Sequence, residues 1–264
     1  MAKYRTLQIV LIGSGRLARN LGHAIKEAGH CIIQVYSPTL SHAKSLALEL
    51  NASTYCNSIA DLIRNANCYI IAIKDDAIAD VVKQLNVGNS LVVHTSGSTS
   101  VDVFKGYAKH YGVFYPFQTF TNKLVSFQEI PIFIESPSSE CLSHLKELGG
   151  FISAKVSVLN SENRLKLHIA AVFVCNFLNH MLVLGNSLIQ EANLDFSTLR
   201  PLVEQTIMNA FSTDNPVNAQ TGPASRNDIN VINKHIELLT SRPDLQAIYQ
   251  LLTNSILKQQ DEQL

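Results

Sequence analysis

A glycine-rich segment close to the start of the chain has the spacing of a phosphate-binding turn. It follows the apolar stretch 7–12 and has the pattern G-x-G-x-x-A, in the residues Gly13, Ser14, Gly15, Arg16, Leu17 and Ala18. The first glycine of this pattern permits a tight turn, the second lets a pyrophosphate approach backbone N–H groups, and the small last residue allows close helix packing. Because a strand precedes the segment and a helix follows it, the segment predicts a dinucleotide site. A tight turn without a ligand is the alternative.

The end of the second expected strand bears on which dinucleotide binds. A site for NAD usually has Asp or Glu there, to accept hydrogen bonds from the ribose. This chain has no acidic residue between Glu27 and Glu49 and offers hydroxyl groups and a lysine instead, although Pro38 stands where many NADP sites have arginine. We therefore expect Ser37 and Thr39 to contact the cofactor, and we favour NADP over NAD. A turn that only caps a helix is the alternative.

Polar side chains follow three later strands, at the edge of the sheet where ligands bind in open α/β folds. Lys74 is expected beside the cofactor ribose. His94 and Ser96 follow a buried strand and are expected where a nicotinamide and a substrate meet, as candidate catalytic groups. Gln118 lies in an uncharged aromatic loop and is expected to contact the substrate. For the segment that contains Lys74 and for the one that contains His94 and Ser96, the alternative role is capping of the following helix.

The stretch 167–190 has no charged residue, yet it contains polar side chains at a regular spacing. His168, Val172, Asn176 and His180 recur every four residues, so a helix places them on one face. Polar groups in an apolar helix need partners, and a substrate is one such partner. We expect His168 and Asn176 to be catalytic and His180 to bind substrate. Histidines that are satisfied within a core are the alternative.

A second candidate for substrate binding is the loop 221–228, which precedes another expected helix. Thr221 and Gly222 begin this loop. Arg226 is expected to hold an anion such as a carboxylate or a phosphate, because a guanidinium binds such groups with paired hydrogen bonds. A solvated arginine beside a helix cap is the alternative.

The elements that must position these residues change in type along the chain. Apolar runs that alternate with helical patterns predict an α/β fold with a doubly wound sheet of the Rossmann type. Strands are expected at 7–12, 31–36, 68–73, 90–95, 112–115, 131–135 and 153–158. Helices are expected between them at 15–28, 41–50, 58–65, 76–85, 100–109 and 138–148. Only helices are expected after that, at 161–192, 196–211, 228–241 and 244–259. We predict a dinucleotide-binding domain over 1–160 and an all-α domain over 161–264.

Composition excludes several classes of protein. The 264 residues are 46% hydrophobic and 16% charged, the reverse of a disordered chain. The 21 basic and 21 acidic residues balance, so neither nucleic acid nor an anionic membrane is an expected partner. Five cysteines without metal-binding spacing predict reduced thiols, no metal site and a cytoplasmic protein. The N-terminus is too poor in apolar residues for a signal peptide.

The scarce charge is also distributed unevenly. Residues 84–101, 110–122 and 167–190 contain no Asp, Glu, Lys or Arg. Because asparagines and histidines interrupt the longest of these segments, we interpret it as a buried helix between domains and across a dimer. The alternative interpretation is a membrane span.

Six segments in order carry a resemblance to a known family. They are GSGRLARNLG, AIKDDAI, HTSGS, GVFYPFQTFT, RLKLHIAAVFVCNFLNHM and TGPASRND. With these motifs the chain resembles uncharacterised proteins that pair an NADP-binding Rossmann-like domain with a helical domain of unknown function. That family is similar to pyrroline-5-carboxylate reductase, prephenate dehydrogenase and the β-hydroxyacid dehydrogenases. The helical domains of these enzymes are of the 6-phosphogluconate dehydrogenase C-terminal type.

The resemblance implies a two-domain reductase, commonly dimeric through its helical domain, with substrate held between the nicotinamide and that domain. It implies that Ser96 and Gly97 belong to the loop on the nicotinamide side. The segment 221–225 is similar to the substrate loop of the pyrroline reductase. One departure is clear: β-hydroxyacid dehydrogenases have Lys four residues before Asn on the corresponding helix, whereas this chain has Val172 before Asn176. Their proton-transfer mechanism therefore does not carry over.

These observations lead to a hypothesis of function with two rivals. We expect an NADP(H)-dependent oxidoreductase that reduces a small carbonyl or imine substrate in an interdomain cleft, with protonation by His168, His94 or water. The first rival is a non-catalytic dinucleotide-binding sensor or interaction protein. The second is an oxidation like that of prephenate dehydrogenase, which the lack of an arginine cluster disfavours.

Overall fold

The chain divides between Cys175 and Asn176 into two compact units, and the computed structural model describes residues 6–261. The last strand of the sheet ends at Val158 and the next helix begins at Ser161. The change from strands to helices predicts a domain boundary near residue 160. That boundary stays a prediction, because the two compact units divide at a later position in the chain.

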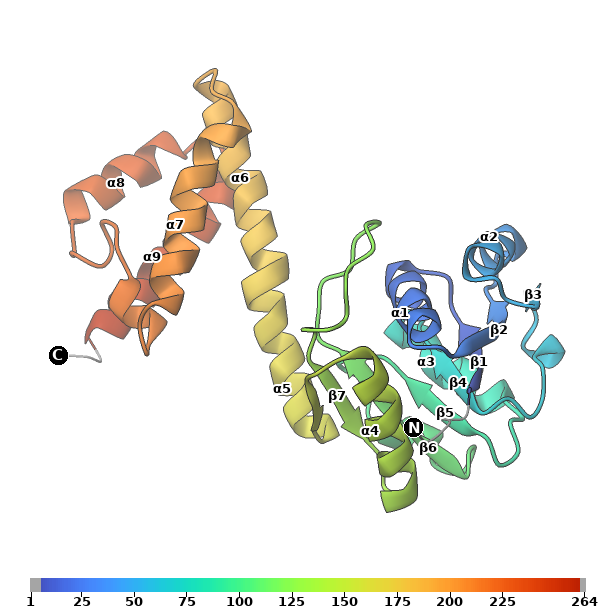
Figure 1. The fold of residues 1–264 in the computed structure, drawn as a ribbon. Coiled ribbons are helices and arrows are strands. Elements are labelled where there is room, and N and C mark those ends of the chain that lie inside the picture. The colour runs from blue at the N-terminus through green and yellow to red at the C-terminus, as the bar shows by residue number, and fades with distance from the viewer. Residues whose placement is uncertain (1–5, 262–264) are drawn as a thin grey trace. The chain divides into compact units, whose positions relative to one another are not determined.

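The first unit contains one sheet with the strand order β3-β2-β1-β4-β5-β6-β7-β8 (Figure 1). All neighbouring strands are parallel except β6 and β7. The order reverses between β1 and β4, which is the switch point where open α/β sheets bind ligands. The strands are β1 (Gln8–Ile12), β2 (Cys31–Tyr36), β3 (Thr54–Cys56), β4 (Cys68–Ile71), β5 (Leu91–His94), β6 (His110–Pro116), β7 (Ile132–Glu135) and β8 (Val156–Val158).

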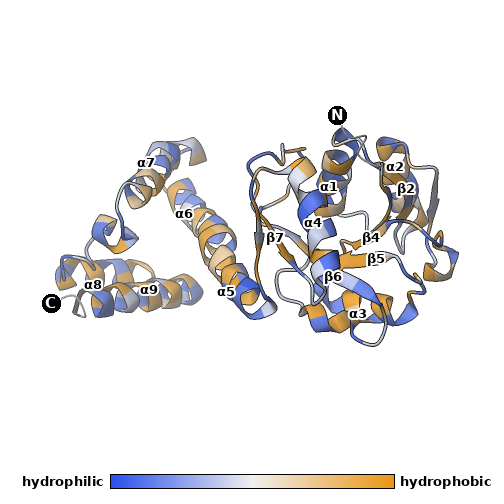
Figure 2. Ribbon diagram, turned by 60° about the horizontal axis from the view of Figure 1, so that its bottom comes forward, coloured by the Kyte–Doolittle hydropathy of each residue, from blue (hydrophilic) through white to orange (hydrophobic). Residues whose placement is uncertain are grey.

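Helices cover both faces of this sheet because its central strands are apolar on both sides. In β1, Ile9 and Leu11 belong to one buried cluster and Val10 and Ile12 to another, as a period of two residues requires. Helices α1 (Arg16–Glu27), α2 (Leu40–Leu50) and α4 (Ser139–Ile152) pack on the first cluster, and α3 (Asp75–Gln84) packs on the second. Hydrophobic residues mark the central strands in Figure 2. The predicted doubly wound α/β fold with a helical region after it is confirmed.

Two predicted helices are wrong. The segment 58–65 contains only a 3-10 turn, Ile59–Asp61, because the Tyr69 hydroxyl donates to the Ile63 carbonyl and holds this stretch as a loop. The segment 100–109 is helical only over Val101–Phe104, as a 3-10 turn. Gly106, which follows it, has φ +85°, and this backbone conformation does not continue a helix. The short strand β3 was not predicted, since three residues carry too little periodic signal.

The described residues after Val158 form helices and turns and no strand. The elements are α5 (Ser161–Ala171), a π-helical stretch (Val172–Phe177), α6 (Leu178–Glu191), α7 (Arg200–Phe211), α8 (Ile229–Leu238) and α9 (Pro243–Asp261), with 3-10 turns at Phe196–Leu199 and Pro216–Ala219. The π-helical stretch has more residues per turn than an α-helix. The four-residue spacing of His168, Asn176 and His180 therefore does not follow one straight stripe.

The segment 167–190 is exposed in the single chain, so its burial between domains and across a dimer stays a prediction. Neither α6 nor the π-helical stretch before it has a buried residue, and Phe173 is 63% exposed. By length and composition alone, the continuous helix Ser161–Glu191 is also apolar enough to cross a membrane. Core helices of soluble proteins pass the same test, so the finding is weak evidence for a span.

Candidate functional site

The glycine turn after β1 is held in a shape that only glycine tolerates. Gly13 has φ +128°, and a Cβ atom there would lie 2.1 Å from the Ala72 carbonyl oxygen. Its N–H donates to the Tyr36 carbonyl at 2.8 Å, which ties the turn to the end of β2. Ala18, in the first turn of α1, is fully buried, as close packing of this helix on the sheet requires. The turn therefore brings the start of α1 to the switch point of the sheet.

The N-terminus of α1 is open. Gly15 is its N-cap residue, no side chain caps the helix there, and a Cβ atom added to Gly15 would meet nothing within 4 Å. The first N–H groups of a helix have no partner inside the helix, and the helix dipole favours an anion beside them. This end of α1 thus fits a phosphate. Leu17, the residue after Arg16 in the glycine-rich segment, is half-buried.

Hydroxyl groups lie beside this end, at the ends of β1 and β2. The Ser14 hydroxyl donates to the Ser37 hydroxyl at 2.9 Å, and Ser37 is buried. Thr39 is the N-cap of α2 but makes no side-chain capping bond. Arg16 donates from Nε to Asn122 at 3.2 Å, so its side chain is held against the loop after β6. The structure therefore brings these four predicted cofactor residues to one edge of the sheet.

The side chain of His94 is buried beneath the loop after β5. Its Nδ1 accepts from the Ser96 N–H at 3.2 Å, and its ring stacks on Phe104. Burial, helped by the positive charge of Arg164, lowers the pKa of His94 to about 4. Its Nε2 has no hydrogen-bond partner among the described residues. His94 is therefore neutral at pH 7, and its side chain is not exposed to ligands.

The loop itself turns around Ser96. The Ser96 hydroxyl oxygen accepts from the N–H groups of Ser98 and Thr99, at 3.1 and 2.9 Å. The Ser96 side chain thus closes a turn within the loop, whereas Ser100 caps the 3-10 turn that follows. The Ser98 hydroxyl makes a short hydrogen bond to Asp75 at the start of α3, directly after the exposed Lys74. This bond joins the loops after β4 and β5.

His168 on α5 lies against this loop and against a tyrosine from β6. The Tyr115 hydroxyl and His168 Nδ1 are 3.2 Å apart. A Cβ atom on Gly97 would lie 2.7 Å from His168 Nδ1 and 2.9 Å from Tyr115 Cζ, so only glycine allows the loop to come this close. Sequence reasoning did not single out Tyr115 as a site residue. Its position at the end of a strand was the one signal that could have marked it.

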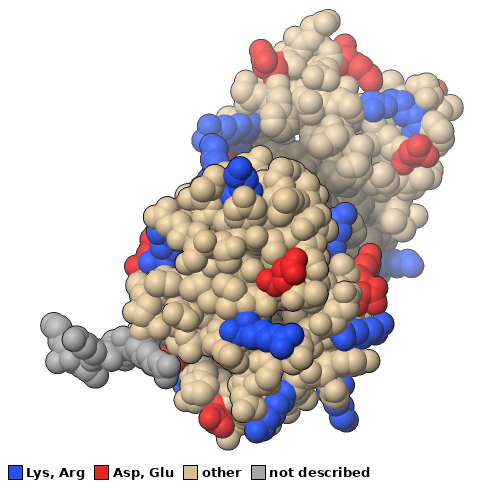
Figure 3. Space-filling model, turned by 90° about the vertical axis from the view of Figure 1, so that its right-hand side faces the viewer, with Lys and Arg blue, Asp and Glu red and all other residues tan. Residues whose placement is uncertain are grey.

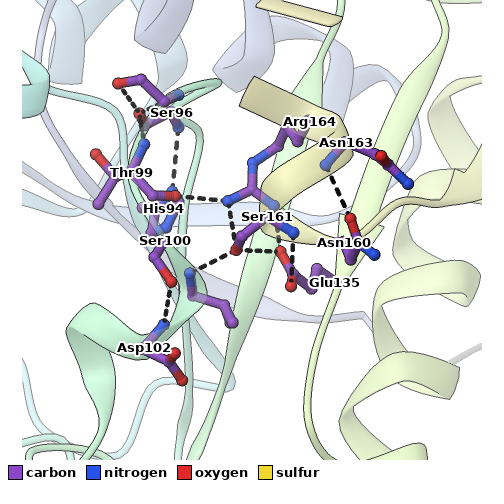
Figure 4. A network of polar contacts seen from close by, with 12 residues as sticks. His94, Ser96, Thr99, Ser100, Asp102, Glu135, Asn160, Ser161, Asn163 and Arg164 are labelled. Carbon is purple, nitrogen blue, oxygen red and sulfur yellow. Dashed lines mark hydrogen bonds and ion pairs between the residues drawn. The ribbon is translucent and has the colours of Figure 1, made fainter. Parts of the chain in front are cut away.

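A buried ion pair fastens α5 to β7, and its arginine also binds the same loop (Figure 4). Arg164 is 1% exposed and makes a short bond to Glu135 of β7. It also donates to the Thr99 carbonyl at 2.5 Å and to the Ser161 hydroxyl at 3.1 Å. Ser161 in turn donates to Glu135 through its N–H and its hydroxyl. Because His168 is one helical turn after Arg164 on α5, this network fixes the position of His168 relative to the loop.

Sequence reasoning missed this ion pair. The two residues are 29 positions apart, and nothing in the residue pattern couples an arginine on a helix to a glutamate that ends a strand. No group of three or more His, Cys, Asp or Glu in the described part of the chain is arranged to hold a metal.

Comparison with known proteins agrees with this geometry. Residues 8–97 match the family described as NADP oxidoreductase, coenzyme F420-dependent, and residues 130–256 match a domain of unknown function, DUF2520. A Bacteroides fragilis protein assigned to the NADP oxidoreductases is 42% identical, with 96% of this chain and 98% of that chain covered and a TM-score of 0.90. The chain belongs to the family of NADP oxidoreductases that carry DUF2520.

More distant solved structures share the fold of this NADP oxidoreductase family. An imine reductase from Myxococcus stipitatus in complex with NADP+ is 14% identical over 95% of this chain and 93% of that chain, with a TM-score of 0.66. A 1-pyrroline-5-carboxylate reductase from Streptococcus pyogenes is 14% identical over 96% and 99% of the two chains, with a TM-score of 0.63. No curated protein sequence matches this chain significantly.

The remaining candidates lie elsewhere in this family member. In the second unit, Asn176 and His180 are exposed, and Thr221 and Arg226 lie exposed in the loop before α8. Gly222 has φ +107° in that loop, and Asp228 caps α8 by accepting from the Val231 N–H. In the first unit, the Gln118 side chain accepts from the neighbouring Thr119 N–H at 2.8 Å. None of these side chains is buried.

Proposed function

We propose that this protein is an NADP(H)-dependent oxidoreductase that reduces a small carbonyl or imine compound. The observation that carries this proposal is the open N-terminus of α1 beside a pair of serine hydroxyls, with no carboxylate at the end of β2. Gly15 leaves room there for a pyrophosphate. Ser14 and Ser37 offer hydroxyl groups to a 2′-phosphate, and Arg16 and Thr39 stand next to them.

The preference for NADP is tested by replacing Ser37 with aspartate. A carboxylate at this position would repel a 2′-phosphate and accept from ribose hydroxyls instead. We expect Ser37→Asp to weaken NADPH binding by about tenfold or more, or roughly 1.4 kcal/mol, and to leave NADH binding unchanged or tighter. Fluorescence titration of both dinucleotides measures this. Ser41→Asp is the matched control on the exposed start of α2 and should change the ratio of the two constants little.

The cofactor would supply a hydride from its nicotinamide, and the residues of this chain would bind and orient the substrate. We propose that Ser96 and Gly97 line the nicotinamide and that Lys74 borders its ribose. The proton that the reduced heteroatom needs is proposed to come from His168 or water, because the His94 side chain is fully buried and does not reach a ligand. Asn176 is proposed as a further catalytic residue. His180, Thr221, Gly222, Arg226 and Gln118 are proposed substrate contacts.

Label transfer tests the reaction itself. Tritiated NADPH is incubated with the protein and a pool of cell metabolites, and transfer of tritium to any metabolite is measured. We expect His168→Gln to slow transfer by about 10²- to 10³-fold and to leave NADPH affinity unchanged, as loss of a general acid does. His144→Gln on the exposed part of α4 is the matched control. Tight NADPH binding without transfer to any metabolite would favour the non-catalytic sensor instead.

We also propose that two copies of the chain associate through the second unit. Exposed apolar side chains gather on its helices, namely Phe177, Leu178, Val183, Leu202, Met208 and Phe211. Exposed apolar side chains in this number favour an interface with another macromolecule. We propose that these side chains form the interface of a cytoplasmic dimer. The protein is proposed to bind a small-molecule substrate, and neither nucleic acid nor a membrane. Figure 3 shows basic and acidic side chains interspersed on one face. A sedimentation mass of one 29.1 kDa chain at micromolar concentration would contradict the dimer.

A further inference from the structure

Three elements of the first unit meet at His168. The helix α5 carries the imidazole, β6 carries Tyr115, and the loop after β5 passes between them at Gly97. The Tyr115 hydroxyl lies 3.2 Å from His168 Nδ1, within hydrogen-bond distance. The two rings meet edge to face, with centroids 6.3 Å apart. This arrangement gives the two nitrogens of the ring different surroundings.

The phenol of Tyr115 is able to donate this hydrogen bond. Burial raises the pKa of Tyr115 to about 12, and the negative charge of Asp75 acts in the same direction. The hydroxyl therefore keeps its proton at neutral pH. Nδ1 of His168 is its hydrogen-bond partner in the described part of the chain, and which of the two groups donates depends on the tautomer of the ring. A neutral imidazole that accepts at Nδ1 carries its proton on Nε2.

The position of the ring is held from two further sides. Arg164, one turn earlier on α5, binds Glu135 and the Thr99 carbonyl, which restrains the helix against the loop. Gly97 leaves no room for the imidazole and the phenol to move toward the loop. On the other side of the ring, Nε2 makes no hydrogen bond to the described residues of this unit and is not among its buried unpaired atoms. Nε2 is thus the nitrogen that a ligand can reach.

We propose that the Tyr115 hydroxyl donates to His168 Nδ1, so that Tyr115 is a positioning residue that fixes the uncharged form of this imidazole as the Nε2–H tautomer and the site offers an N–H donor to its substrate. A substrate whose reacting atom accepts a hydrogen bond, a carbonyl oxygen or a neutral imine nitrogen, fits this donor. A protonated iminium, which presents N–H and has no free lone pair, does not. This statement about substrate class rests on the proposed function, whereas the tautomer does not.

Nitrogen NMR of the full-length protein tests the tautomer without any substrate. With ¹⁵N-labelled histidine, two-bond ¹H–¹⁵N correlations distinguish a protonated from an unprotonated ring nitrogen, and His168→Gln assigns the signals. At a pH where His168 is neutral, we expect a protonated Nε2 and an Nδ1 signal displaced toward the value of a hydrogen-bond acceptor. In Tyr115→Phe, we expect this displacement to be lost and the Nδ1–H form to become detectable. Tyr111→Phe, on the same strand, should change neither.

Two results would overturn the proposal. One is a protonated Nδ1 in neutral wild-type His168, and the other is the same spectrum in wild type and Tyr115→Phe. If label transfer identifies a substrate, Tyr115→Phe should lower kcat roughly tenfold, a fraction of the ~10²- to 10⁴-fold that general acid catalysis supplies. Its KM for NADPH should stay unchanged. Failure of label transfer would contradict the proposed function alone, because the NMR result does not depend on it.

Discussion

Replacing Arg164 by methionine is expected to lower the free energy of unfolding of the first unit by about 3–5 kcal/mol. Arg164 is 1% exposed and lies against Glu135, so its removal leaves a carboxylate that is largely shielded from water and has lost its counter-charge. The loss of the bond to the Thr99 carbonyl adds a second unpaired group. Denaturant unfolding measured through a probe in the first unit gives the value.

Two companion variants separate the buried ion pair from general effects of the substitution. Lys166→Met removes an exposed partner of Glu162 two residues along the same helix, and should change stability by less than about 1 kcal/mol. The double variant Glu135→Gln with Arg164→Met should recover part of the loss, because no unpaired charge remains. If Arg164→Met cost no more than Lys166→Met, the network would not hold α5 to the sheet.

Acidification should destabilise the fold through His94. Its pKa is about 4 in the folded protein, below the ordinary value of 6.5, because burial disfavours the charged ring. The unfolded chain therefore binds a proton at this residue below about pH 6.5, and the folded chain does so only near pH 4. The stabilisation is complete above pH 6.5 and is lost as the pH falls to 4. At about 1.4 kcal/mol for each pH unit, the loss is on the order of 3 kcal/mol.

Stability curves from pH 8 to pH 4 check this expectation. His94→Asn retains an acceptor for the Ser96 N–H but does not titrate, so its stability should fall by about 3 kcal/mol less over this range than that of the wild type. His144→Asn, exposed on α4, should retain the wild-type slope. Equal slopes in His94→Asn and the wild type would mean that His94 has the same pKa in the folded and the unfolded protein.

Much of the fold and the shape of the glycine turn could be predicted because the signals are local. Gly13 and Ala18 follow from a turn and a close helix contact that a short segment defines by itself. The alternation of strands and helices predicts the sheet, since each strand is an apolar run bounded by turns. The two wrongly predicted helices, at 58–65 and 100–109, arose because the spacing of apolar residues favoured a helix there. The bonds of Tyr69 and the conformation of Gly106 end these two helical patterns.

The chain by itself determined the α/β fold, the glycine turn and the missing carboxylate after β2, because these depend on neighbouring residues. Only the tertiary structure decided that Arg164 is buried against Glu135, that Tyr115 meets His168, and that Gly97 stands between them. It also showed that the charge-poor helix is exposed in the single chain. The physical reason is distance: such contacts join residues far apart in sequence, and their energies depend on burial, which residue spacing does not report.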